Sequence, residues 1–228
     1  MRQELDEKIQ SILNTAFLER VEDIKRELSE QLQNNCGSLL EAAVAQACDK
    51  AARESRTQLL ESLSNAVRRI RNEETVTDIA ATLVDAASQF CGRCALFIHK
   101  QDRVMGFKAK GFQAPGFGEA FQKLATPLSQ AAAIGHSIET RDTVVCGGSA
   151  NELSQEIVNL FELKNEVRAH LFPVTLRDSV LAVVYADSGP EQKSAVDSTV
   201  IEILTASAEA WIEAVGTRKK KAAEMATV

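Results

Sequence analysis

The sequence predicts an α+β protein in which an antiparallel sheet flanked by helices follows two long α-helices. Residues 1–74 contain no Pro and a single Gly, Gly37, whereas the remainder holds all four Pro and every other Gly. Beyond residue 75, apolar runs come in pairs separated by short polar turns, which is typical of antiparallel hairpins. The composition, 45% hydrophobic and 25% charged, is that of a globular protein.

Helical periodicity dominates residues 1–74. Apolar residues recur there at mostly three- and four-residue spacing and leave the charged residues on the opposite face, beginning with Leu5, Ile9, Ile12, Ala16, Val21, Ile24, Leu28 and Leu32. Residues 34–37 favour a helix end, and Ser38 with Glu41 forms a capping box that starts a second helix. We expect this module to mediate self-association, either as an antiparallel hairpin or as a coiled coil between subunits, and both alternatives stay open.

Residues 75–216 are predicted to form one domain. Strands are expected where apolar residues run together, at 94–99, 103–109, 143–145, 169–176 and 180–186. Helices are expected where apolar residues recur at helical spacing, at 76–91, 128–134, 151–163 and 195–215. Residues 110–118 are rich in Gly and form a loop, and residues 217–228 form a basic flexible tail.

Four segments carry a family resemblance. They are residues 78–98, which join a helix to the strand Cys-Ala-Leu-Phe-Ile, residues 107–111, residues 134–145, and the hairpin at 170–187 with Pro173 near the end of its first strand. Together they resemble the GAF domain, a small-molecule sensory fold related to PAS domains, over roughly residues 70–215. The resemblance implies a pocket between the sheet and the loops 110–125 and 140–160, and dimerisation through flanking helices. The Asn-Lys-Phe-Asp-Glu signature of cyclic-nucleotide-binding members is absent from the sequence, as are the bilin-binding motifs.

Composition excludes several function classes. The net charge of −6 argues against a nucleic-acid binder, which needs clustered Lys and Arg. No apolar run reaches the length of a membrane-spanning helix, and the acidic first residues are unlike a secretory signal. Five cysteines, an odd number, indicate reduced thiols. We therefore expect a cytoplasmic protein that contacts neither nucleic acid nor membrane.

The cysteines offer one chemical alternative. Cys91 and Cys94 form a C-x-x-C pair, but each continues an apolar face, so we expect both to be small buried hydrophobes. A metal site completed by His99 fails because that residue lies roughly 16 Å along the strand from Cys94. Cys146, beside two glycines, is the better candidate for a reactive thiol. A thiol redox enzyme similar to free-methionine-sulfoxide reductases would use Cys146 with Cys91 or Cys94, although the flanking residues differ from theirs.

Strand alternation defines a candidate ligand site. Arg168, His170 and Phe172 are predicted to share one face of a strand, with Tyr185 nearby on the adjacent strand. The composition suits a small ligand that is partly anionic or aromatic. The alternative is that this face is the solvent side of the sheet. The full candidate set is Phe112, Arg141, Cys146, Arg168, His170 and Tyr185.

The sequence thus favours a non-enzymatic signalling or regulatory homodimer that senses a small molecule and transmits through its helices to a signalling partner. It predicts no catalytic residue, cofactor or metal. A pure dimerisation scaffold is the main alternative, and it would be favoured if Phe97, Phe107, Phe112 and Phe172 filled the pocket together. The ligand, the downstream partner and the number of subunits stay open.

Overall fold

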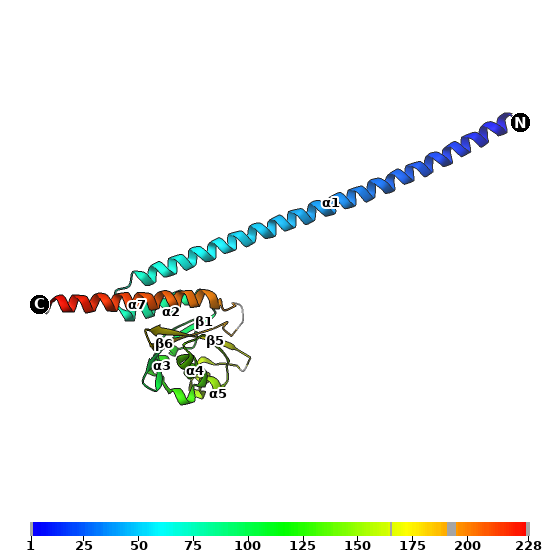
Figure 1. The fold of residues 1–228 in the computed structure, drawn as a ribbon. Coiled ribbons are helices and arrows are strands. Elements are labelled where there is room, and N and C mark those ends of the chain that lie inside the picture. Colours follow the sequence, from blue (N-terminus) through cyan, green and yellow to red (C-terminus); the bar gives the residue numbers. More distant parts are fainter. Residues whose placement is uncertain (1, 165, 191–194, 227–228) are drawn as a thin grey trace. The chain divides into compact units, whose positions relative to one another are not determined.

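The computed structural model describes residues 2–164, 166–190 and 195–226, and within them the side chains of residues 20–27, 43–164, 166–190 and 195–218. The chain divides into two compact units, Met1–Leu60 and Glu61–Val228. Figure 1 traces the chain from blue at the N-terminus to red at the C-terminus. Among the described residues, no helix is both long enough and apolar enough to cross a membrane.

The first unit belongs to a single helix, α1 (Arg2–Arg71). The helix end predicted at residues 34–37 is therefore wrong, and so is the antiparallel hairpin that depended on it. An Asn or Gly inside a helix costs only about 1 kcal/mol or less relative to Ala. The Leu, Ala, Glu and Gln residues that flank residues 34–37 are strong helix formers, and they outweigh that cost.

The last turns of α1 pack within the second unit. Ala66 and Ile70 are fully buried there, and Leu63 and Val67 pack against the same core. The two units therefore separate at residues 60 and 61, earlier than the boundary predicted at residue 74. Gly, Pro and aromatic residues mark turns and cores, but they do not reveal which part of a long helix packs against a domain.

The described residues of the second unit form six further α-helices and six strands. The helices are α2 (Val76–Ala87), α3 (Phe117–Lys123), α4 (Ala132–Thr140), α5 (Ala150–Leu153), α6 (Gln155–Phe161) and α7 (Ser198–Ala226), with a 3-10 turn at Leu128–Gln130. The strands are β1 (Arg93–Lys100), β2 (Arg103–Lys110), β3 (Ala125–Pro127), β4 (Val144–Gly147), β5 (Arg168–Leu176) and β6 (Ser179–Asp187). They form one antiparallel sheet in the order β3-β2-β1-β6-β5-β4.

Both predicted hairpins are confirmed, as β1–β2 and β5–β6. Four predictions are wrong in detail. The helix expected at 128–134 is a 3-10 turn followed by α4, which begins at Ala132. The helix expected at 151–163 is split into α5 and α6 at Ser154, whose φ of 79° breaks the helix and whose hydroxyl caps the second piece. Helix α3 begins inside the predicted loop, and α7 continues to Ala226 through the predicted flexible tail.

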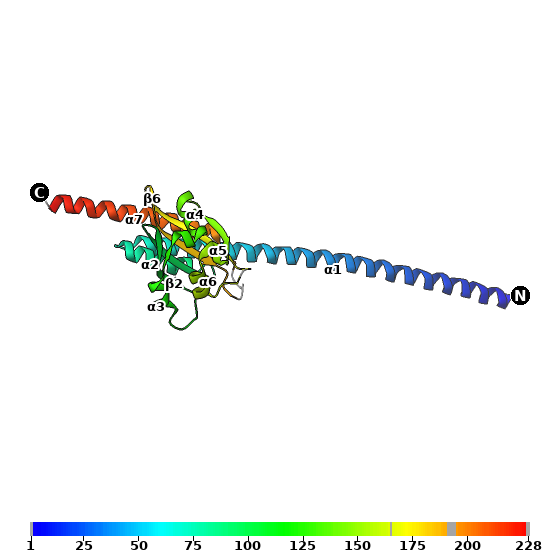
Figure 2. The same cartoon turned by 90° about the horizontal axis from the view of Figure 1, so that it is seen from below.

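The sheet has a core on each face. Along β1, Cys94 and Leu96 face one core, and Ala95 and Phe97 face the other, as alternation requires. The end of α1, α2 and α7 supply the first core, and α3 to α6 supply the second. Figure 1 shows α2 and α7 above the sheet with α3, α4 and α5 below it, and Figure 2 looks onto the lower layer.

Trp211 joins α7 to the end of α1 and to the turn that follows it. Its indole N–H on α7 donates to the carbonyl of Glu73 in the turn between α1 and α2, at 2.8 Å. The guanidinium carbons of Arg71 and Arg218 lie 5.9 and 4.9 Å from the ring centroid, within cation–π distance. Side-chain contacts therefore hold the end of α1 against α7.

These contacts predict where the chain tolerates truncation. A chain that begins at Glu61 should keep the free energy of unfolding of the second unit. One that begins at Asn72 lacks Ala66 and Ile70, and should be less stable by about 2–5 kcal/mol, the cost of removing a large buried aliphatic side chain. Urea denaturation of the two chains measures the difference. Equal stabilities would contradict the assignment of residues 61–71 to this domain.

Candidate functional site

A buried ion pair closes one end of the sheet's central strand pair. Arg93 is the first residue of β1, Asp187 is the last of β6, and the two lie opposite each other in the antiparallel register. The side chain of Arg93 is 6% exposed and that of Asp187 is fully buried. Charges removed from water to this degree are retained only where they are paired and hydrogen-bonded.

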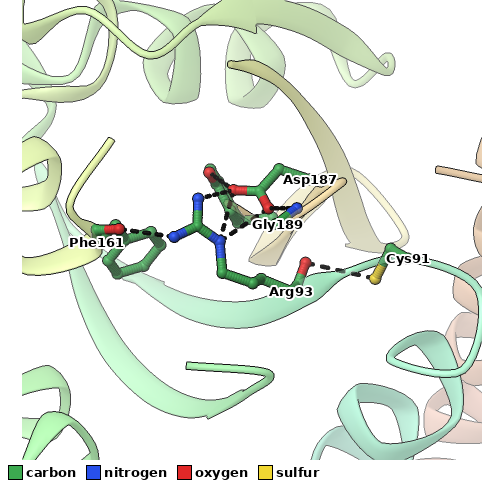
Figure 3. Close-up of polar contacts among 6 residues, drawn as sticks. Cys91, Arg93, Phe161, Asp187 and Gly189 are labelled. Carbon is green, nitrogen blue, oxygen red and sulfur yellow. Dashed lines mark hydrogen bonds and ion pairs between the residues drawn. The ribbon is translucent and has the colours of Figure 1, made fainter. Parts of the chain in front are cut away.

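The geometry meets that requirement (Figure 3). Arg93 Nε donates to Asp187 Oδ1 at 2.9 Å, and Nη2 donates to Oδ2 at 2.6 Å, which makes a bidentate pair. Arg93 Nη1 donates to the carbonyl of Phe161 at the end of α6, at 2.7 Å. Asp187 also accepts from the Tyr185 hydroxyl and from the backbone N–H of Gly189.

Electrostatics keep the cluster in one protonation state. Burial alone would lower the pKa of Arg93, but the hydrogen bonds and charge of Asp187 outweigh it, and the pKa of Arg93 is raised. Burial raises the pKa of Tyr185 well above its ordinary value, and the Asp187 carboxylate raises it further. Tyr185 therefore stays protonated and donates to Asp187, while Arg93 stays charged.

A cavity of about 330 Å³ adjoins this ion pair. Phe112 forms one wall: its ring stacks on Phe117 with centroids 4.2 Å apart and contacts Phe161 at 4.6 Å. The guanidinium carbon of Arg93 lies 5.1 Å from the Phe112 centroid. The remaining lining comes from the loop after β2, the end of α6 and the segment after β6, namely residues 111, 113–115, 160, 162 and 190.

Arg93 keeps hydrogen-bonding capacity beside the cavity. A guanidinium carries five N–H groups. The contacts to Asp187 and Phe161 use three of them, and the other two donate to none of the described residues. A ligand with an oxygen acceptor and a flat face would therefore meet both an N–H donor and aromatic rings in this cavity.

The space beneath the centre of the sheet is filled. Phe97, Phe121, Phe161 and Tyr185 pack there with centroid separations between 5.0 and 6.0 Å. The cavity therefore lies at the rim, in the loop 110–118, rather than under the whole sheet. The packing of Phe97, Phe107, Phe112 and Phe172 that would favour a pure scaffold is not found, because Phe107 and Phe172 face the opposite core.

The six predicted ligand residues do not come together. Phe112, Cys146 and Tyr185 belong to the lower core, whereas His170 stacks against Phe172 on the upper face, with centroids 6.2 Å apart. Tyr185 was predicted to lie beside His170, but it pairs with Leu171 and therefore points to the opposite face. A one-residue difference in register reverses the face of every side chain, and the sequence does not fix it.

The two remaining arginines are at the surface. Arg141 adopts a left-handed conformation at the end of α4, and its guanidinium lies 3.7 Å from Asp178. Arg168 is exposed at the start of β5. The Nδ1 atom of His170 is buried with no partner among the described residues, and burial followed by the charge of Arg168 lowers the pKa of this ring.

Cys91 and Cys94 lie together, and Cys146 lies apart from them. Cys91 and Cys94 are buried in the upper core, which confirms the packing interpretation, and Cys146 is buried in the lower one. The Cys91 thiol, then burial, raises the pKa of Cys94 well above its ordinary value. Burial, then Glu152, raises the pKa of Cys146 to about 12. Within the described part of the chain, no group of three His, Cys, Asp or Glu side chains is placed to hold a metal.

Sequence reasoning missed the Arg93–Asp187 pair. A signal was present, because Arg93 directly precedes one apolar strand and Asp187 directly follows another. Opposite charges at such positions meet when the strands are antiparallel neighbours. The sequence does not reveal that β1 and β6 are neighbours, since each belongs to a different hairpin.

The fold is that of GAF domains. The GAF domain/HD domain protein from Geobacter sulfurreducens matches with a TM-score of 0.53 and 12% identity, over 66% of this chain and 98% of that one. The GAF domain of an Acinetobacter phosphoenolpyruvate-protein phosphotransferase matches at 0.52 and 17%, over 70% and 95%. Free methionine-R-sulfoxide reductase from Neisseria meningitidis, in complex with its substrate, matches at 0.51 and 14%, over 69% and 90%. No family model and no curated protein matches the sequence.

Because the ion pair is buried, removing the charge of Asp187 should strongly lower the free energy of unfolding. Asp187→Asn keeps the size of the side chain but leaves the Arg93 charge buried without its partner, and should lower the free energy of unfolding by about 3–5 kcal/mol. Asp178→Asn, which removes an exposed carboxylate 3.7 Å from Arg141, is the matched control and should have little effect. Urea denaturation measures both. If the two variants were equally stable, the ion pair would not hold the domain together.

Proposed function

We propose that this chain is a non-enzymatic, cytoplasmic regulatory protein whose GAF-fold domain binds a small planar ligand beside Arg93. One observation carries the proposal: a buried guanidinium, oriented by Asp187, lines a cavity walled by Phe112 and Phe161. Hydrogen bonds from Arg93 would select an acceptor such as a carboxylate or carbonyl, and the rings would select a flat molecule. The GAF domains among the similar structures support a sensory role.

A route from the cavity to the helices supports a role in transmission. Asp187 accepts from the N–H of Gly189 at 2.7 Å, and the next residue, Pro190, lines the cavity. This segment leads into α7, whose start is held by the N–H of Asp197 donating to the carbonyl of Phe90 at 2.9 Å. We propose that a ligand that moves Gly189 and Pro190 acts on α7, which follows them in the sequence.

Self-association through α1 is the second part of the proposal. Apolar side chains on this helix are exposed to solvent, with Val44 at 56% and Leu60 at 58%. Burying such surface contributes about 25 cal/mol per Å². A second copy of the same helix is the partner we propose, since its exposed apolar residues would be buried by the same contact.

The dimerisation scaffold stays as the second candidate, because aromatic side chains fill the interior beneath the sheet. The redox alternative has less support. Cys146 lies on the opposite side of the sheet from Cys94, and a pKa of about 12 leaves little thiolate at neutral pH. Because the thiolate is the reactive form, this cysteine is poorly suited to nucleophilic attack.

Ligand binding is tested with benzoate, which carries a flat ring and an acceptor. Benzoate should raise the melting temperature, by an amount equivalent to about 2.7 kcal/mol at 100 times its dissociation constant, whereas benzylamine, which is a cation, should not. Phe112→Ala should abolish the shift. Phe107→Ala, a half-buried Phe on the other face, is the matched control and should keep it. A benzoate shift that survives Phe112→Ala would contradict this site, and the absence of any shift from planar acceptors would favour the scaffold.

Dimerisation is tested by sedimentation velocity of the full chain. Leu60→Glu places a charge on the exposed apolar surface of α1 and should weaken the dimer at least tenfold. Gln58→Glu adds the same charge at a polar exposed position and should leave it intact. A full chain that sediments as a monomer, or a Leu60→Glu variant that associates as tightly as the parent, would refute the role of α1.

A further inference from the structure

A second hollow lies on the opposite face of the sheet, between α2 and α7. It is a groove of about 270 Å³, and its floor is formed by β1, β2, β5 and β6. Twelve of its fourteen lining residues are apolar, and the largest are Ile79, Leu83, Leu96, Phe107, Leu181 and Ile212. The aromatic cavity beside Arg93 is built from other residues on the other side of the sheet, so the two spaces are separate.

The groove offers almost no hydrogen-bonding capacity. Its polar lining consists of Thr77 and His99. Both ring nitrogens of His99 already lie within hydrogen-bond distance of backbone carbonyls, Nδ1 at 2.9 Å from Val180 and Nε2 at 2.7 Å from Gln101. A charged side chain is absent from the lining altogether.

This lining suits an apolar molecule better than water. A buried water needs two to four polar partners. Because both ring nitrogens of His99 already contact backbone carbonyls, the remaining polar side chain is Thr77, with one hydroxyl. An ionic ligand would lose its hydration without gaining a countercharge. A neutral apolar ligand would lose little and would bury its own surface against Leu, Ile and Phe side chains.

The volume limits the size of the occupant. An apolar cavity of roughly 150 Å³ accommodates benzene. About 270 Å³ therefore suits a bicyclic ring.

We propose that this groove is a binding site for a neutral bicyclic aromatic molecule, which would lie between α2 and α7. Such a ligand would contact the accessible lining residues Val76 and Ala80 on α2 and approach Ile212 on α7. Because it bridges the two helices, its binding stabilises their packing. The inference does not depend on the aromatic cavity, and each site can fail without the other.

The probe for this site is indole, added to the full chain. Methyl NMR signals of Ile79, Leu83 and Ile212 should shift on titration, whereas indole-3-acetate, which adds a carboxylate, should bind at least tenfold more weakly. Ala80→Leu fills the groove from a half-buried position on α2 and should weaken indole binding at least tenfold. Leu181→Phe fills it from β6 and gives an independent test if the first variant does not fold.

The control is Phe112→Ala, which alters the other cavity and should leave indole binding unchanged. Three outcomes would overturn the proposal: no methyl shifts up to the solubility of indole, unchanged affinity in both folded filling variants, or loss of binding in Phe112→Ala. The last would place indole beside Arg93 instead. Failure of benzoate to bind beside Arg93 would leave this result untouched, so the two sites are tested separately.

Discussion

The Arg93–Asp187 ion pair fixes the point at which four segments of the domain meet. It joins the start of β1 to the end of β6, holds the end of α6 through the Phe161 carbonyl, and anchors the chain after β6 through Gly189. Charges buried to this extent cost several kcal/mol each unless all their partners are present. The loops at this end of the sheet must therefore close around the pair, and the cavity at the rim exists because they do.

The two faces of the sheet are covered by different kinds of packing. The lower face is closed by aromatic rings, which fill the volume beneath β1 and β6 and leave space only where the loop 110–118 turns away. The upper face is closed by helices, whose rounded surfaces do not cover a flat sheet completely. The aromatic cavity beside Arg93 thus results from ring packing on one face, and the apolar groove results from helix packing on the other.

The parts of the fold that depend on neighbouring residues could be predicted from the sequence. Both hairpins are local, and their apolar runs flank short polar turns. The pairing of β1 with β6 joins residues 94 positions apart in the ion pair, and no local pattern records it. For this reason Arg93 was missed. The face of Tyr185 was wrong for a different reason, because the sequence does not determine the register of the β5–β6 hairpin. The continuity of α1 was missed because Asn and Gly favour a helix end without enforcing one.

Helix α7 is the element through which a ligand at either proposed site would affect the end of α1. In the sequence it follows Gly189, whose N–H donates to Asp187, and Pro190, which lines the cavity, and its middle lines the apolar groove with Ala208 and Ile212. Between those two residues, Trp211 donates to the carbonyl of Glu73 in the turn that ends α1. If the proposed ligands displace α7, they would strain or relax this hydrogen bond, which lies at the end of the helix proposed to join two copies of the chain.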